Sequence, residues 1–88
     1  GKVSKIYHKN KSRLYKDIPE CFVATRYHSL IIDKNSLKKE LIITAELEDQ
    51  TIMGIEHVSA PLYGVQYHPE SIKTDYGKTI IRNFINVA

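Results

Sequence analysis

Alternating apolar and polar positions mark the middle of the chain. Over residues 41–47 one set of alternate positions is apolar, namely Leu41, Ile43, Ala45 and Leu47, and the other set carries Thr44 and Glu46. A period of two is the pattern of a half-buried β-strand. Residues 48–50 (EDQ) predict a turn and residues 51–58 a returning strand. The pattern therefore predicts a β-hairpin.

Further segments rich in β-branched and aromatic residues predict additional strands. They cover residues 3–8, 21–32 and 60–69. The second of these strands is expected to break near His28, and the third to end at Pro69, because proline has no N–H for a sheet ladder. Between the first two strands, residues 9–12 predict a turn and residues 13–18 a single helical turn that Pro19 ends.

The hydrophobic period changes at the end of the chain. Apolar residues now recur at helical spacing, at Tyr76, Ile80, Ile81, Phe84 and Val87. Thr74 is a suitable N-cap residue, and Asp75 suits the positive end of a helix dipole. The pattern predicts a helix over residues 75–86, so that several strands are followed by one terminal helix.

The composition fits one small globular domain. The chain has 88 residues, of which 42% are hydrophobic and 26% charged. No apolar run approaches the length of a membrane span, and no secretory signal is visible, so no membrane partner is expected. The single cysteine, Cys21, excludes an internal disulfide and a cysteine-based zinc site, and suits a reducing cytoplasm.

Positive charge is concentrated near the start of the chain. The net charge is +3, and no acidic residue offsets the basic residues of the first sixteen positions, which are Lys2, Lys5, Lys9, Lys11, Arg13 and Lys16. Such a stretch is compatible with a nucleic-acid patch or with a solvated edge strand, since edge strands often carry lysines. No recognised nucleic-acid motif accompanies the charge, so we interpret it as a solvated edge and expect His8 within it to be solvated.

His68 and Glu70 form the clearest candidate site. In extended backbone, positions i and i+2 point to the same side, and Pro69 between them restricts its own φ and that of His68. A histidine held by a carboxylate is the general-base half of a nucleophilic triad, but a structural pair or a polar turn fits the same spacing. A zinc deaminase site would need a downstream Pro-Cys-x-x-Cys, which is absent, so no metal is expected.

Several stretches carry a resemblance to a known family. YGVQYHPES (63–71), followed by IKTDYG (72–77) and RNFI (82–85), resembles the C-terminal signature of class I glutamine amidotransferases. ATRYHSL (24–30) and IMGIEH (52–57) match in the same order and at suitable spacing. RYHSL together with HPESI resembles the glutaminase components of anthranilate synthase and of aminodeoxychorismate (para-aminobenzoate) synthase, without separating the two.

The resemblance implies a fold and a set of site residues. The whole domain would be a flavodoxin-like α/β sheet with an added antiparallel portion, and residues 1–88 would be its C-terminal part, mostly strands plus a C-terminal helix. His68 matches the triad histidine that takes the proton of a nucleophilic cysteine, and Glu70 matches the acid that orients it. Ser29 and Leu30 match positions that hold the substrate glutamine, largely through backbone groups.

The family's nucleophile is not found in these 88 residues. It lies in a Gly-x-Cys-x-Gly-x-Gln elbow upstream of RYHSL, in an N-terminal half that this chain lacks. Cys21 has no flanking glycines, and we expect it to be a small, partly buried hydrophobic residue instead. The chain alone is therefore expected to be inactive.

The complete domain is expected to be an enzyme. It would hydrolyse glutamine without a cofactor and pass ammonia to a chorismate-using synthase subunit. A non-catalytic binding module is the alternative.

Overall fold

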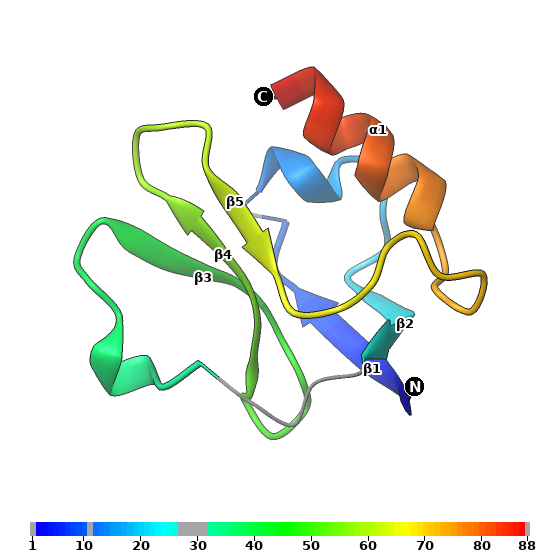
Figure 1. The fold of residues 1–88 in the computed structure, drawn as a ribbon, viewed down its shortest axis with the longest axis horizontal. Coiled ribbons are helices and arrows are strands. Elements are labelled where there is room, and N and C mark those ends of the chain that lie inside the picture. Colours follow the sequence, from blue (N-terminus) through cyan, green and yellow to red (C-terminus); the bar gives the residue numbers. More distant parts are fainter. Residues whose placement is uncertain (1, 11, 27–31, 88) are drawn as a thin grey trace.

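The computed structural model describes residues 2–10, 12–26 and 32–87, which form a curled sheet, two short 3-10 helices and an α-helix (Figure 1). The strands are β1 (Lys2–His8), β2 (Cys21–Arg26), β3 (Leu41–Glu46), β4 (Ile52–His57) and β5 (Tyr63–Val65). The 3-10 helices are η1 (Arg13–Tyr15) and η2 (Lys34–Ser36), and the α-helix is α1 (Gly77–Val87). Within the described residues no helix is both long and apolar enough to cross a membrane.

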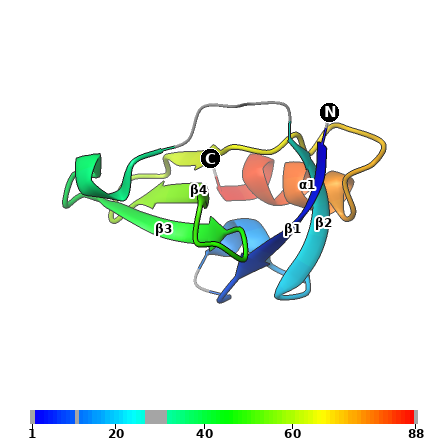
Figure 2. The same ribbon diagram turned by 90° about the horizontal axis from the view of Figure 1, so that it is seen from below.

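The sheet is antiparallel throughout, with the strand order β2-β1-β3-β4-β5. Its two halves are strongly twisted, so that β1 and β2 cross the direction of β3 and β4 steeply (Figure 2). After β5 the chain crosses to the opposite edge of the sheet, where His68 pairs with Thr25 of β2. The curl therefore brings the His-Pro-Glu segment against β2, although β2 and β5 lie at opposite ends of the strand order.

The predicted hairpin over residues 41–58 is confirmed, but the alternation within its first strand is not. β3 pairs with β4, and the register shifts on both sides of Ala45. Thr44 and Ala45 are consecutive, and both are buried. The prediction that Thr44 faces away from the apolar set is therefore wrong, because a β-bulge turns two neighbouring side chains inward.

The remaining predicted elements are confirmed in type and corrected in length. The single helical turn is η1, and the strand expected over residues 60–69 is regular only at β5. The strand expected over residues 21–32 is described as far as Arg26, and its expected break near His28 lies outside the described residues.

The terminal helix begins later than predicted, and Thr74 is not its N-cap. α1 starts at Gly77, after Tyr76 with a φ of 60°. The Thr74 hydroxyl instead bonds the backbone of Thr25 and His68. On the helix, Ile80 is buried, and Asn83 donates to the carbonyls of Leu14 and Lys16 at 2.9 and 2.8 Å. These contacts fix α1 to η1.

The core lies inside the curl and is rich in aromatic rings. Its buried apolar residues are Ile6, Leu14, Tyr15, Ile18, Phe22, Ala24, Ala45, Met53, Tyr67 and Ile80. Tyr67 meets Phe22 edge to face, and its hydroxyl lies 2.8 Å from that of Tyr15. The residue directly before His68 is thus anchored in the core.

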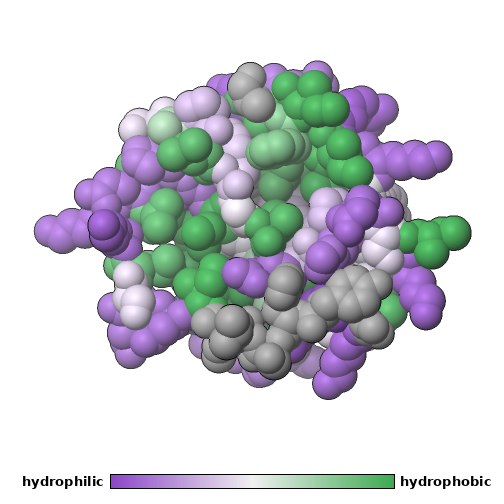
Figure 3. All heavy atoms as spheres, in the orientation of Figure 1, coloured by the Kyte–Doolittle hydropathy of each residue, from purple (hydrophilic) through white to green (hydrophobic). Residues whose placement is uncertain are grey.

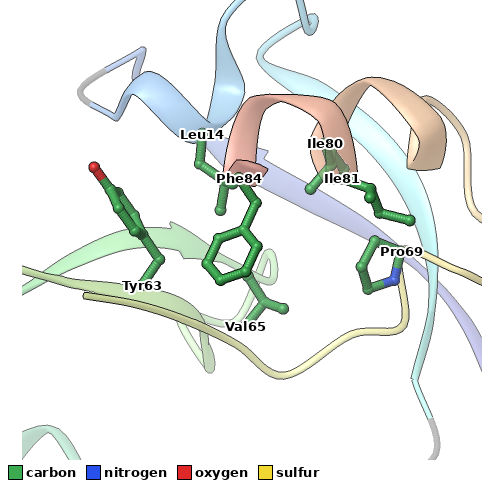
Figure 4. A pocket seen from close by; sticks show the side chains of 7 residues that line it. All are labelled: Leu14, Tyr63, Val65, Pro69, Ile80, Ile81 and Phe84. Atoms are coloured by element: carbon green, nitrogen blue, oxygen red, sulfur yellow. The ribbon is translucent and has the colours of Figure 1, made fainter. Parts of the chain in front are cut away.

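An apolar groove separates α1 from β5. Seven residues line its volume of about 170 Å³, namely Leu14, Tyr63, Val65, Pro69, Ile80, Ile81 and Phe84. Phe84 points from α1 toward Val65, with Tyr63 on one side and Pro69 on the other (Figure 4). Phe84 is 45% exposed and Ile85 68% exposed. Apolar side chains gather over α1 and over the neighbouring strands on this face (Figure 3).

Candidate active site

His68 and Glu70 lie together at the surface, just after the chain has crossed to β2. His68 Nδ1 is 2.8 Å from Glu70 Oε2, with the two side chains 30% and 65% exposed. Residues 69–70 form a turn rather than the extended backbone that the sequence predicts. The predicted placement of both side chains on one side is nevertheless confirmed. Their catalytic roles stay predictions.

The geometry of the pair suits an imidazole that donates a hydrogen bond from Nδ1 to an ionised carboxylate. The pKa of Glu70 lies below its ordinary value, first because its own backbone N–H bonds the carboxylate and second because His68 does. An ionised carboxylate only accepts hydrogen bonds, so Nδ1 carries the proton and donates it to Glu70. With the proton on Nδ1, Nε2 is the nitrogen that a neutral ring uses as a general base.

The backbone of His68 is fixed by β2 and by the turn that follows. His68 N–H donates to Thr25 O at 2.8 Å, and Ser71 N–H donates back to His68 O at 3.2 Å. The Thr74 hydroxyl donates to His68 O at 2.6 Å and accepts from Thr25 N–H at 3.0 Å. The Ser71 hydroxyl donates to Thr25 Oγ1 at 3.1 Å. The histidine is therefore held by groups from both sides of the turn.

Gly77 allows α1 to start directly against this turn. A Cβ at this position would overlap the Pro69 carbonyl, a backbone group that cannot swing aside. The preceding Tyr76 takes a left-handed φ of 60°, which turns the chain into the helix. The start of the helix and the His-Pro-Glu turn thus lie in contact, and only glycine fits between them.

Of the other predicted site residues, Ser29 and Leu30 lie outside the described residues. Cys21 is exposed at the start of β2, so the expectation that it is partly buried is wrong. It lies four residues from Thr25, the partner of His68, which is about 13 Å along an extended strand. Cys21 is therefore too far along β2 to share a proton with His68.

The remaining described histidines have structural partners. His8 is buried, not solvated as predicted, because it shares the inner face of β1 with Ile6. Its Nε2 lies 2.7 Å from Pro19 O, and its Nδ1 accepts from Asn10 N–H at 3.1 Å. His57 Nδ1 accepts hydrogen bonds from the backbone N–H groups of Ser59 and Ala60.

Sequence reasoning missed the hydroxyl residues around His68. The Thr74 hydroxyl joins the backbones of Thr25 and His68, and the Ser71 hydroxyl bonds the hydroxyl of Thr25. Thr25 lies within ATRYHSL and Ser71 within YGVQYHPES. A buried Thr in a strand pattern and a polar residue in a turn carry no local signal of a shared contact, so the motifs themselves were the available clue.

A His–Glu pair held on a turn at the edge of a curled sheet has the contact that the base and acid of a nucleophilic triad require. The glutamine amidotransferase class-I family model matches residues 1–87. The chain belongs to the class I glutamine amidotransferase family.

Relatives and a solved structure agree with this membership. The chain is 52% identical over 87 residues to anthranilate synthase component 2 of Cyanophora paradoxa, covering 98% of this chain and 45% of that protein. It is 45% identical over 85 residues to aminodeoxychorismate/anthranilate synthase component 2 of Bacillus subtilis, covering 97% and 43% respectively. The chain thus spans less than half the length of these curated relatives.

The fold also matches a crystal structure described as a GMP synthase subunit from Thermoplasma acidophilum. The TM-score is 0.87 at 26% sequence identity, and the match covers 97% of this chain and 42% of that one. The prediction of a class I amidotransferase fold, with strands and one C-terminal helix over these residues, is confirmed.

Proposed function

We propose that residues 1–88 are the C-terminal part of a single glutamine amidotransferase domain, the glutaminase subunit of anthranilate synthase. The observation that carries the proposal is the 2.8 Å contact between His68 Nδ1 and Glu70 Oε2, which presents the imidazole as a base. The N-terminal half of the domain would supply the nucleophilic cysteine, since the chain spans less than half of its relatives. Ser29 and Leu30 would hold the glutamine.

In the complete domain, His68 Nε2 takes the thiol proton as the cysteine sulfur attacks the side-chain amide carbon of glutamine. The imidazolium then gives that proton to the leaving ammonia, and a thioester remains. His68 next takes a proton from water, whose oxygen attacks the thioester carbon, and returns it to the departing thiolate. Glu70 stays ionised throughout and stabilises each imidazolium.

The groove between α1 and β5 is the face that we propose packs against the missing half. It is apolar, partly exposed and adjacent to β5, which ends the strand order. A segment that covers the groove would bury the exposed part of Phe84 and of its apolar neighbours.

The partner that we propose is a chorismate-using synthase subunit in the cytoplasm, which consumes the ammonia. The names of the relatives support a synthase partner, since both are named as component 2 of a synthase. The Bacillus subtilis relative, named for both products, favours aminodeoxychorismate synthesis as the second candidate. Chromatographic identification of the aromatic product made from chorismate and glutamine by the co-purified complex decides between them.

The test of the site compares His68→Ala with Glu70→Gln in the complete protein. His68→Ala should abolish most glutamate formation, whereas Glu70→Gln leaves the imidazole and should cost less, with about 10⁴-fold as the upper bound. Synthesis from added ammonia should survive both changes, because it bypasses the glutaminase site. If His68→Ala retains turnover, the assigned role of His68 is wrong. If added ammonia fails to support synthesis, either that role is wrong or the substitution disrupts assembly.

A further inference from the structure

The hydroxyl of Thr74 occupies an unusual place between two paired residues. In a hydrogen-bonded antiparallel pair, two opposite residues exchange both of their N–H···O bonds. Thr25 and His68 pair in this way on one side, where His68 N–H donates to Thr25 O at 2.8 Å. On the other side Thr74 Oγ1 stands between the partners, accepting from Thr25 N–H at 3.0 Å and donating to His68 O at 2.6 Å.

We propose that Thr74 is a positioning residue for the catalytic base, whose hydroxyl relays the second ladder bond and so fixes where His68 leaves β2. The proposal rests on the proposed role of His68. Thr25 and Thr74 are only 1% and 7% exposed, so no bulk water substitutes for the hydroxyl. The relay needs a group that accepts and donates at once, which among side chains of this size only serine and threonine provide.

Two neighbouring hydrogen bonds also attach the turn that carries the Thr74 hydroxyl to β2. The Ser71 hydroxyl donates to Thr25 Oγ1 at 3.1 Å, and Asp75 N–H donates to Val23 O at 2.8 Å. The turn is therefore attached to β2 on both sides of Thr74. Within it, the Thr74 bond is the one side-chain hydrogen bond seen to the carbonyl of His68 itself in the described part of the chain.

The consequence for catalysis is a fixed imidazole. The carbonyl group and the side chain of His68 are attached to the same Cα. A shift of this carbonyl group therefore moves Nε2 and weakens the hydrogen bond between Nδ1 and Glu70. Misplacement of a reacting group by about 1 Å costs on the order of 100-fold in rate. In the proposed site Ser29 and Leu30 hold the glutamine and Nε2 transfers the proton, so the loss should fall on kcat and leave KM nearly unchanged.

The experiment tests a series of substitutions at position 74 in the complete amidotransferase, assembled with its synthase partner. Thr74→Val, which keeps the shape but removes the hydroxyl, should lower kcat for glutamine hydrolysis by roughly 10- to 100-fold. Thr74→Ser should recover most of the wild-type kcat. Thr79→Val, at a half-buried threonine of α1 without a hydroxyl contact seen in the described chain, should change nothing. Ammonia-dependent synthesis reports whether each variant is folded and assembled.

A second readout is independent of turnover. The pKa of Glu70 lies below its ordinary value, first through its own backbone N–H and second through His68. It should rise in Thr74→Val as the imidazole moves away, and carbon NMR of the Glu70 carboxyl group measures that rise. If Thr74→Val does not fold, Thr74→Cys replaces it, since a thiol is a weak donor and acceptor, and its kcat should fall clearly below that of Thr74→Ser.

The possible outcomes separate the two proposals. A Thr74→Val protein with wild-type kcat and unchanged Glu70 titration overturns the positioning role, as does Thr74→Ser with a loss equal to that of Thr74→Val. If Thr74→Cys is used, a kcat equal to that of Thr74→Ser overturns it. Glutamate formation that survives His68→Ala overturns the proposed function instead, and the Glu70 titration then still decides whether Thr74 positions His68.

Discussion

The hydroxyls of Tyr15 and Tyr67 predict that Tyr67→Phe destabilises the wild-type protein but stabilises the Tyr15→Phe variant. The two oxygens lie 2.8 Å apart in the core, and Tyr67 directly precedes His68 in the chain. Tyr15 has a second polar neighbour, the Thr44 hydroxyl, which also acts on its pKa. Tyr67 has only Tyr15 among the described residues. The two hydroxyls therefore depend on each other unequally.

The expected free energies follow from this asymmetry. Tyr67→Phe removes one hydrogen bond and leaves Tyr15 beside Thr44, so it should lower the free energy of unfolding by about 0.5–1.5 kcal/mol. Tyr15→Phe leaves the Tyr67 hydroxyl buried without a partner, which should cost a further penalty of about 1–3 kcal/mol. When Tyr67→Phe is added to Tyr15→Phe, it removes that orphaned hydroxyl and should restore part of the stability.

The assay is urea unfolding of the complete protein and of the three variants, compared at constant m-value so that the midpoints report stability. Glutamine turnover of Tyr67→Phe should equal that of the wild type, because the hydroxyl faces the core and not the site. If Tyr67→Phe is equally destabilising in both backgrounds, the two hydroxyls do not interact and the reasoning fails.

The same pair predicts a dependence on alkaline pH. Burial raises the pKa of Tyr15 to about 12 and raises the pKa of Tyr67 further. Above pH 10 the unfolded chain loses these protons and the folded chain keeps them, so the free energy of unfolding falls as pH rises. The double Phe variant lacks both groups and should lose less stability than the wild type between pH 10 and 12.

Other predictions concern the chain alone and the start of α1. The isolated 88-residue chain should form no glutamate from glutamine, and Cys21→Ala in the complete domain should leave turnover unchanged; activity of the isolated chain that Cys21→Ala abolishes would make Cys21 the nucleophile. The isolated chain should also associate or unfold without a sharp transition. Burial of a large apolar side chain contributes roughly 1.5–3 kcal/mol, and an exposed side chain such as Phe84 lacks part of that stabilisation. The free energy of unfolding of a whole domain is only about 5–15 kcal/mol. Sedimentation and thermal unfolding test this, and a monomer with a cooperative, concentration-independent transition contradicts it. Gly77→Ala should displace the Pro69 carbonyl and lower both the unfolding midpoint and glutamine turnover, whereas Lys78→Ala, exposed beside it, should change neither.

Much of this protein is determined by short-range signals in its sequence. The hairpin of β3 and β4 follows from alternation around a polar turn, and α1 follows from a change of hydrophobic period. The contact between His68 and Glu70 spans only two residues, so their spacing predicts that both side chains share one side, although the backbone between them is a turn and not extended. Such features are readable because the backbone geometry of a few consecutive residues decides them.

The tertiary structure decided the features that join distant parts of the chain. Thr74 looked like a helix cap, yet its hydroxyl bonds Thr25, 49 residues away, because the curl brings the turn against β2. The sequence predicts a solvated His8 among lysines, yet His8 lies on the inner face of β1 with Ile6 and is buried. The bond between Tyr15 and Tyr67 spans 52 residues. A local pattern shows which side of a strand is apolar, but only the closed sheet determines which polar groups meet inside it, because each buried group must find its partner across the fold.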